Sequence, residues 1–153
     1  MSKSPAATAV VAAYAPRGAE CAYANLKLMS RAVGSLYDEM FRSAGLRANQ
    51  VALMWAIAAL EPVDLGRLGE QTFTDQTTLS RTVENLRRAR LVNVRPGRDR
   101  RQKLVRLTPS GQRAFARAMP HWEEAQRRAA KLLPLGDLRG LARQLRHKTP
   151  AAS

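Results

Sequence analysis

The 153-residue sequence has one cysteine, two histidines and few aromatic residues, which make up 5% of the chain. Its single cysteine, Cys21, cannot form an internal disulfide bond, so a disulfide-framework protein is excluded. No run approaches the ~20 apolar residues of a membrane-spanning helix, which excludes an integral membrane protein. The sequence has no phosphate-binding glycine loop, cysteine pair or carboxylate cluster, and His121 and His147 stand apart from any nucleophile pattern. We therefore expect no enzyme, metal site or cofactor.

Positive charge is abundant and unevenly distributed. The net charge is +14, yet residues 1–80 hold seven basic and seven acidic side chains. Residues 81–106 hold ten basic and two acidic side chains, and residues 107–153 hold nine and three. A neutral first half followed by a basic block predicts a folded scaffold that presents a surface for a polyanion.

Apolar periodicity predicts several helices. Apolar residues recur at three- and four-residue steps over 22–43, which indicates a long amphipathic helix that ends at Gly45. Asn49 is expected to cap a second helix that closes before Pro62. Asp64, and then Thr74 or Asp75, are expected to cap two short helices whose tight connection fits a helix-turn-helix.

After the predicted helix-turn-helix, the apolar residues recur at every second position. Residues 91–95 and 103–107 alternate as strands do, and the turn between them is basic, which predicts a hairpin. Thr108 and Pro109 restart a helix whose apolar stripe continues to residue 133, with a kink or interruption expected at Pro120. A last helix is expected, with Asp137 as its N-terminal cap. The predicted fold is mainly α (α+β): a winged helix-turn-helix with additional helices at both ends.

The end helices carry longer apolar stripes than the central segments can bury, which predicts pairing with a second copy of the chain. We expect a flexible arm over 1–19, one domain over 20–147 and a tail over 148–153. Within the domain, dimerisation helices are expected over about 20–45 and 109–147, and a DNA-binding lobe over about 46–108. The run over 6–15 resembles a signal peptide only faintly, so we expect a cytoplasmic protein.

Four stretches along roughly residues 20–147 form a distinctive combination. They are residues 25–27 and 36–39 in the first helix, 45–50 at the start of the second, 75–81 with Leu86, Leu91 and Val92 around the second helix of the helix-turn-helix, and Asp99, Arg100 and Arg101 followed by 107–111 at the hairpin. Their combined order resembles the MarR family of bacterial transcription regulators. The resemblance implies a homodimeric, nucleoid-associated winged-helix protein that binds double-stranded DNA, usually as a repressor whose affinity for DNA changes with a ligand or with oxidation.

A recognition helix places its N-terminal residues against base edges in the major groove. Gln76 can pair with adenine and Arg81 with guanine, and a threonine methyl group can contact thymine. Thr77, Thr78 and Ser80 can otherwise form hydrogen bonds with phosphates. A solvated, well-capped helix start is the alternative interpretation. Arginines 87, 88 and 90 suit the negative end of the helix dipole and can also contact phosphate.

In the predicted wing, Asp99 and Arg101 are two residues apart and share one side of an extended strand. In the MarR family the matching pair holds the arginine for the minor groove, where negative potential favours it. A solvent-screened surface ion pair is the alternative. Neighbouring phosphates would be neutralised by Arg98, Arg100 and Lys103. We expect the DNA target to be an imperfect palindrome with half-sites one helical turn apart.

Two kinds of effector are compatible with the sequence. A small organic molecule, often an aromatic acid in the MarR family, would use a pocket lined by Asn25, Met54, Trp55, Met119 and Trp122, although the apolar members also suit ordinary core packing. Oxidation of Cys21 would need an intersubunit or small-thiol partner, because the chain has no second cysteine. A lone cysteine is also often a small buried hydrophobe.

Other classes of function remain open. Charge alone allows a sequence-nonspecific architectural or RNA-associated winged helix, but Gln and Thr at the start of the recognition helix argue against a purely phosphate-driven surface. The last helix, with Arg139, Arg143 and Arg146, is a weak candidate for an anionic membrane surface.

Overall fold

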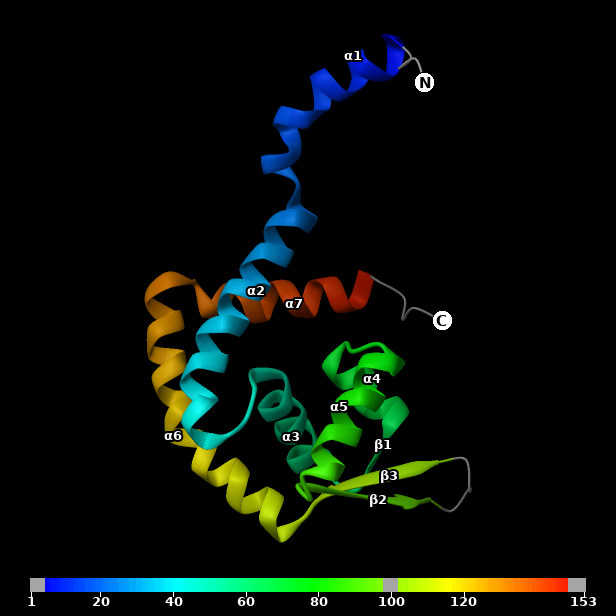
Figure 1. Ribbon diagram of the computed structural model, residues 1–153, viewed down its shortest axis with the longest axis vertical. Coiled ribbons are helices and arrows are strands. Elements are labelled where there is room, and N and C mark those ends of the chain that lie inside the picture. Colours follow the sequence, from blue (N-terminus) through cyan, green and yellow to red (C-terminus); the bar gives the residue numbers. More distant parts are fainter. Residues whose placement is uncertain (1–4, 98–101, 149–153) are drawn as a thin grey trace. The chain divides into compact units, whose positions relative to one another are not determined.

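The computed structural model describes residues 5–97 and 102–148 and divides into two units, residues 1–35 and 36–153 (Figure 1). The architecture is the mainly helical fold with a small sheet that the sequence predicts, with a third strand added. The helices are α1 (Pro5–Tyr14), α2 (Ala22–Phe41), α3 (Ala48–Leu60), α4 (Leu65–Thr72), α5 (Gln76–Arg88), α6 (Pro109–Leu132) and α7 (Leu135–Lys148), with 3-10 turns η1 (Ala15–Glu20) and η2 (Arg42–Ala44); the strands are β1 (Val63–Asp64), β2 (Val92–Pro96) and β3 (Lys103–Leu107).

The first unit is helical from its first described residue. The segment over 1–19, expected as a flexible arm, contains α1 and most of η1. Helix α1 is rich in alanine, the strongest helix former. No described side chain of residues 6–35 is buried.

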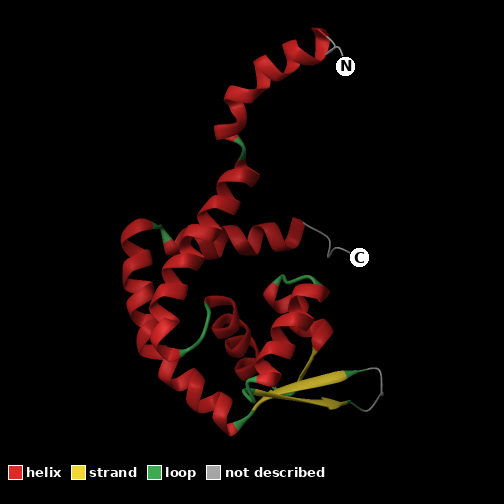
Figure 2. Ribbon diagram, in the orientation of Figure 1, coloured by secondary structure: helices red, strands yellow, loops and turns green. Residues whose placement is uncertain are grey.

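In the second unit, helices α3, α4 and α5 pack against one another and against the sheet, which lies on one side of them (Figure 2). Side chains from all three helices, from the sheet and from the first half of α6 form one hydrophobic core. Gly45 has φ 69° and ends the turn after α2, as the sequence predicts.

Helix α3 begins one residue after Arg47, so the expected cap at Asn49 is wrong. The first-turn amides are satisfied from elsewhere. Asp38 of α2 accepts a hydrogen bond from the Ala48 amide (2.6 Å), and Gln50 accepts one from the Arg47 amide (3.0 Å). A distant carboxylate therefore supplies the cap that a local search assigned to the nearest asparagine.

The sheet has three antiparallel strands in the order β1-β3-β2. The predicted hairpin is present, with Val94 opposite Val105. Strand β1 was not predicted, because two residues are too few to show an alternating apolar pattern. It forms by pairing with β3, where Val63 lies opposite Val105. Glu61 strengthens this junction by accepting a hydrogen bond from the Leu107 amide (2.8 Å).

Helix α6 begins as expected, with the Thr108 hydroxyl accepting from the Gly111 amide (2.9 Å). Of the kink or interruption expected at Pro120, the interruption does not occur: the helix continues through the proline, and Ala118 and Ala125 are buried on either side of it. Helix α7 starts at Leu135, so Asp137 lies in its first turn rather than at its cap. None of the helices in the described residues is long and apolar enough to cross a membrane.

Candidate nucleic-acid interface

The start of α5 is fixed by Asp75, which resolves the choice between Thr74 and Asp75. Its side chain accepts a hydrogen bond from the Thr78 amide (2.9 Å). Hydrogen bonds from Thr78, with the backbone bond the largest contribution, lower the pKa of Asp75 below its ordinary value. A charged cap at this end also complements the positive pole of the helix.

Helix α5 has sharply different faces. Leu79, Thr82, Val83 and Leu86 are buried and fix the rotation of the helix about its axis. All the residues predicted to contact DNA on this helix are exposed, and Arg81 makes no hydrogen bond or ion pair within the described part of the chain. The exposed group consists of Gln76, Thr77, Thr78, Ser80 and Arg81.

Farther along α5, one residue that the sequence analysis did not single out organises the basic side chains. Glu84 accepts hydrogen bonds from Nε and Nη2 of Arg87 (2.7 and 2.8 Å) and from Nε of Arg88 (2.9 Å). These bonds, from Arg87 first and then Arg88, lower the pKa of Glu84 to about 2 and raise that of Arg87. The i+3 and i+4 spacing is a sequence signal that could have revealed the pairing.

The described part of the wing is its two-stranded stem. Gly97 closes it by donating its amide to the Gln102 carbonyl (2.8 Å). Lys103 is exposed at the start of β3, opposite Pro96. The predicted tip residues Arg98, Asp99, Arg100 and Arg101 lie outside the described residues.

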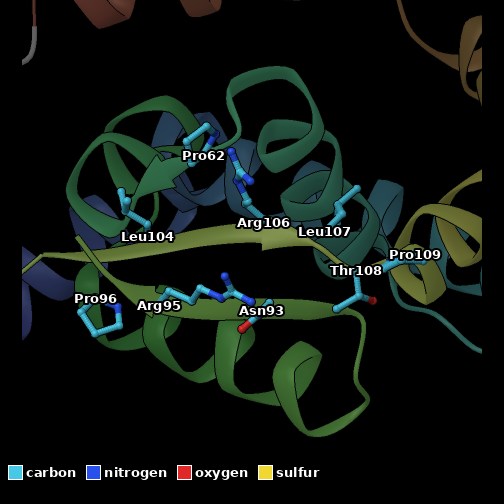
Figure 3. A pocket seen from close by; sticks show the side chains of 9 residues that line it. All are labelled: Pro62, Asn93, Arg95, Pro96, Leu104, Arg106, Leu107, Thr108 and Pro109. Carbon is cyan, nitrogen blue, oxygen red and sulfur yellow. The ribbon is translucent and has the colours of Figure 1, made fainter. Parts of the chain in front are cut away.

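A pocket of about 390 Å³ lies against the stem (Figure 3). Arg106 extends from β3 toward Pro62, and Arg95 lies along β2 near Asn93. Both arginines are exposed and add positive charge to this side of the wing. None of the five residues predicted for an effector pocket lines it.

The four apolar residues predicted for an effector pocket divide into two groups. Met54 is fully buried in the core, whereas Trp55 is 41% exposed on α3. The Trp55 ring lies 5.0 Å from that of Trp122 and 5.5 Å, edge to face, from that of Phe115. Met119 is partly buried against the same core.

The two other candidates for signal sensing belong to the first unit. The Asn25 side chain donates a hydrogen bond to the Ala19 carbonyl (2.7 Å), linking the start of α2 to η1. Cys21 is exposed at that junction, where its amide donates to the Gly18 carbonyl (3.2 Å).

Comparison with known proteins agrees with this geometry. Residues 46–111 match the family model described as a winged helix DNA-binding domain. The M. tuberculosis transcriptional regulator MosR, solved in complex with DNA, is 28% identical with a TM-score of 0.76, and the match covers 84% of this chain and 95% of that one. No curated protein matches the sequence.

Two more distant structures have the same fold. AbsC, a MarR family transcriptional regulator from Streptomyces coelicolor, is 23% identical with a TM-score of 0.67, and the match covers 82% of this chain and 88% of AbsC. MepR of S. aureus, solved in a complex with DNA, is 16% identical with a TM-score of 0.68, and the match covers 82% of this chain and 93% of MepR.

Residues 46–111 thus form a winged helix DNA-binding domain, with α4 and α5 as its helix-turn-helix and β2–β3 as its wing. The chain as a whole has the fold of MosR, AbsC and MepR, which agrees with the winged helix-turn-helix architecture that the sequence predicts.

Proposed function

We propose that the protein is a homodimeric regulator of transcription that binds an imperfect palindrome in double-stranded DNA. The observation that carries the proposal is the exposed row of Gln, Thr, Ser and Arg side chains at the N-terminal half of α5. The opposite face of this helix is fixed in the core, so the row is held ready for a major groove. The basic wing stem beside it supplies phosphate-neutralising charge.

The proposed dimer accounts for apolar side chains that the single chain leaves in solvent. Leu26 and Leu28 of α2 and Leu141 and Leu145 of α7 are all exposed. Large exposed apolar groups of this kind mark surfaces that associate with a partner. Two-fold pairing would place one recognition helix at each half of a palindrome.

The test uses Arg81→Ala, Arg101→Ala and a control, Arg117→Ala, which removes an exposed arginine from α6. We expect each of the first two to weaken binding to a DNA duplex enriched by the wild-type protein by about tenfold or more, since a bidentate base contact is worth about 1–3 kcal/mol. Melting temperatures should remain unchanged. Normal binding by both variants would refute the assigned interface.

The discriminating measurement against a sequence-nonspecific winged helix is the ratio of affinities for the enriched duplex and for a scrambled one. Both affinities should fall with salt, with a log–log slope of about −0.9 per neutralised phosphate. Equal affinities at physiological salt would favour the architectural alternative.

We further propose that the regulator is a repressor released by a small aromatic acid at the cluster of Trp55, Phe115 and Trp122. A partly exposed group of aromatic rings packed edge to face and at a tilt can hold an aromatic ligand. Both tryptophans of the chain lie in this cluster, so intrinsic fluorescence reports binding directly. Titration with benzoate and salicylate should change the emission and weaken DNA binding over the same concentration range.

Oxidation of Cys21 is the alternative signal. A Cys21→Ser variant that still releases DNA with aromatic acids but no longer with hydroperoxide would assign the oxidative response to this residue. Retention of the hydroperoxide response in the variant would remove it.

A further inference from the structure

One face of α5 combines groups of opposite charge. Thr77, Arg81, Glu84 and Arg88 follow one another at steps of four, three and four residues, so they form a single row along the helix. The buried residues Leu79, Thr82, Val83 and Leu86 lie on the other side. Glu84 is the only carboxylate of α5, and it stands between Arg81, which is proposed to contact bases, and Arg88.

Glu84 is fully engaged with the two arginines that follow it. Both of its oxygens accept from Arg87, and Oε1 also accepts from Arg88 at 2.9 Å. Bidentate contacts between charged groups are the strongest and most directional of hydrogen bonds. The low pKa of Glu84 keeps the carboxylate ionised throughout the physiological range.

This arrangement has an electrostatic cost for any phosphate that approaches. Each arginine can neutralise a phosphate only by sharing or breaking its bond to Glu84, and the carboxylate itself repels the DNA backbone. Binding to random sequence rests almost entirely on phosphate neutralisation, whereas binding to a specific site also draws on base contacts made by the first turns of the helix. A restraint on Arg87 and Arg88 therefore weakens random binding more than specific binding.

The geometry points to Glu84 as a specificity-determining residue that restrains Arg87 and Arg88 and thereby lowers affinity for random DNA. This inference rests on the proposed function, because it needs α5 to face DNA. Glu84 acts through the two arginines and is a positioning residue.

The chain contains a matched control for this role. On α6, Glu124 accepts from Nη2 of Arg127 (2.7 Å) and from Nε of Arg128 (2.8 Å), with the same sequence spacing. Both glutamate side chains are 38% exposed. Glu84→Gln and Glu124→Gln raise the net charge equally and keep the shape of the side chain, but only the first changes the proposed DNA-facing row.

The experiment measures the affinity of wild type, E84Q, E124Q and the double variant E84Q/R87Q for two 25-bp duplexes across a salt series. One duplex is enriched from a randomised library by the wild-type protein, and the other is a scrambled sequence of the same composition. Circular dichroism and melting temperature check that each variant is folded.

We expect E84Q to bind the scrambled duplex about fivefold or more tightly than wild type, with a log–log salt slope steeper by about 0.9 for each arginine released. The enriched duplex should change by less than about twofold, so specificity falls. E124Q should behave as wild type. E84Q/R87Q, whose net charge equals that of wild type, should lose at least part of the gain.

Three outcomes would overturn the role of Glu84. Equal gains in E84Q and E124Q would reduce the effect to net charge. A loss of enriched-duplex affinity in E84Q, with no change on the scrambled duplex, would make Glu84 a base-reading residue. Unchanged specificity in E84Q would remove its role altogether. In contrast, a wild-type protein that does not distinguish the two duplexes would contradict the proposed function itself.

Discussion

The two units of the chain differ in what happens to their apolar side chains. In residues 36–148 the leucines and valines of short helices and strands are largely buried, and Leu68, Leu79 and Leu86 are 0% exposed. In residues 6–35 no described side chain is buried, although Val11 and Leu28 are of the same apolar types as the core residues. An amphipathic pattern thus predicts a helix, but it does not say which surface covers the apolar face.

The largest expected effect comes from a test that substitutes one glycine in each unit and so compares the packed unit with the exposed one. A Cβ at Gly111 would lie 1.9 Å from the Leu91 carbonyl oxygen, which also accepts the Thr108 amide. Because that neighbour is backbone, Gly111→Ala should lower the free energy of unfolding by about 4 kcal/mol or more. A Cβ at Gly34 meets nothing within 4 Å, so Gly34→Ala should stabilise α2 by about 0.5–1 kcal/mol.

Thermal and urea unfolding of both variants check this prediction. A Gly111→Ala protein with a wild-type melting temperature would show that the backbone between β2 and α6 can shift to accommodate a Cβ at little cost in stability. A strongly destabilised Gly34→Ala protein would instead reveal a close neighbour for α2 in the proposed dimer.

The next test compares two leucines. Leu68→Ala should reduce stability by about 3 kcal/mol through lost burial and the cavity left behind. Leu28→Ala removes a side chain that is 61% exposed and should change the stability of the single chain by less than about 0.5 kcal/mol. Sedimentation of Leu28→Asp sharpens the comparison: in the proposed dimer, this charge should shift the protein toward monomer. A Leu28→Asp protein that remains as associated as wild type would place the interface elsewhere.

A smaller effect is expected at the end of α5, where Arg90 has φ 59°. This left-handed conformation is costly for a residue with a Cβ but not for glycine. Arg90→Gly should therefore raise the free energy of unfolding by about 1 kcal/mol, measured by urea denaturation. Arg90→Ala is the control, because it removes the same charge and keeps the strain. Equal stability of the two variants would contradict the assigned strain.

The smallest expected effect is on the stability of the fold at acidic pH, through the Asp75 side chain. The pKa of Asp75 is lower in the folded protein, so its cap stabilises the fold above the ordinary carboxyl pKa near 4 and loses this effect as pH falls through the folded value. Asp75→Asn keeps a capping side chain but should show a flatter decline in melting temperature between pH 5 and about 2.5. Identical pH profiles for variant and wild type would exclude a contribution from Asp75.

Local chemistry made much of the fold predictable. Asp64 and Thr108 were identified as helix caps because each can bond an amide three residues ahead, and the structure contains both bonds. The hairpin followed from alternation along the strands. The two caps are bonds over three residues, and the hairpin is recorded by the alternation within each of its strands, so a short window of sequence contains each signal.

Two of the features that escaped prediction depend on partners in another element of the fold. Strand β1 needs β3, and the Ala48 amide needs Asp38. The row of exposed residues at the start of α5 was predicted, but the engagement of Arg87 and Arg88 by Glu84 was not. That pairing is local, and it was overlooked because the helix-dipole interpretation already accounted for the arginines.

The hydrogen bond from Leu107 to Glu61 joins the end of α3 to the end of the wing, and β1 adds its own pairing beside it. Helix α4 starts directly after β1, and α5 packs on β2. The recognition helix and the wing stem are consequently joined by one continuous set of hydrogen bonds and packing contacts. We expect an effector that tilts α3 to turn both elements together, which would alter their angle to the duplex while their mutual spacing is kept.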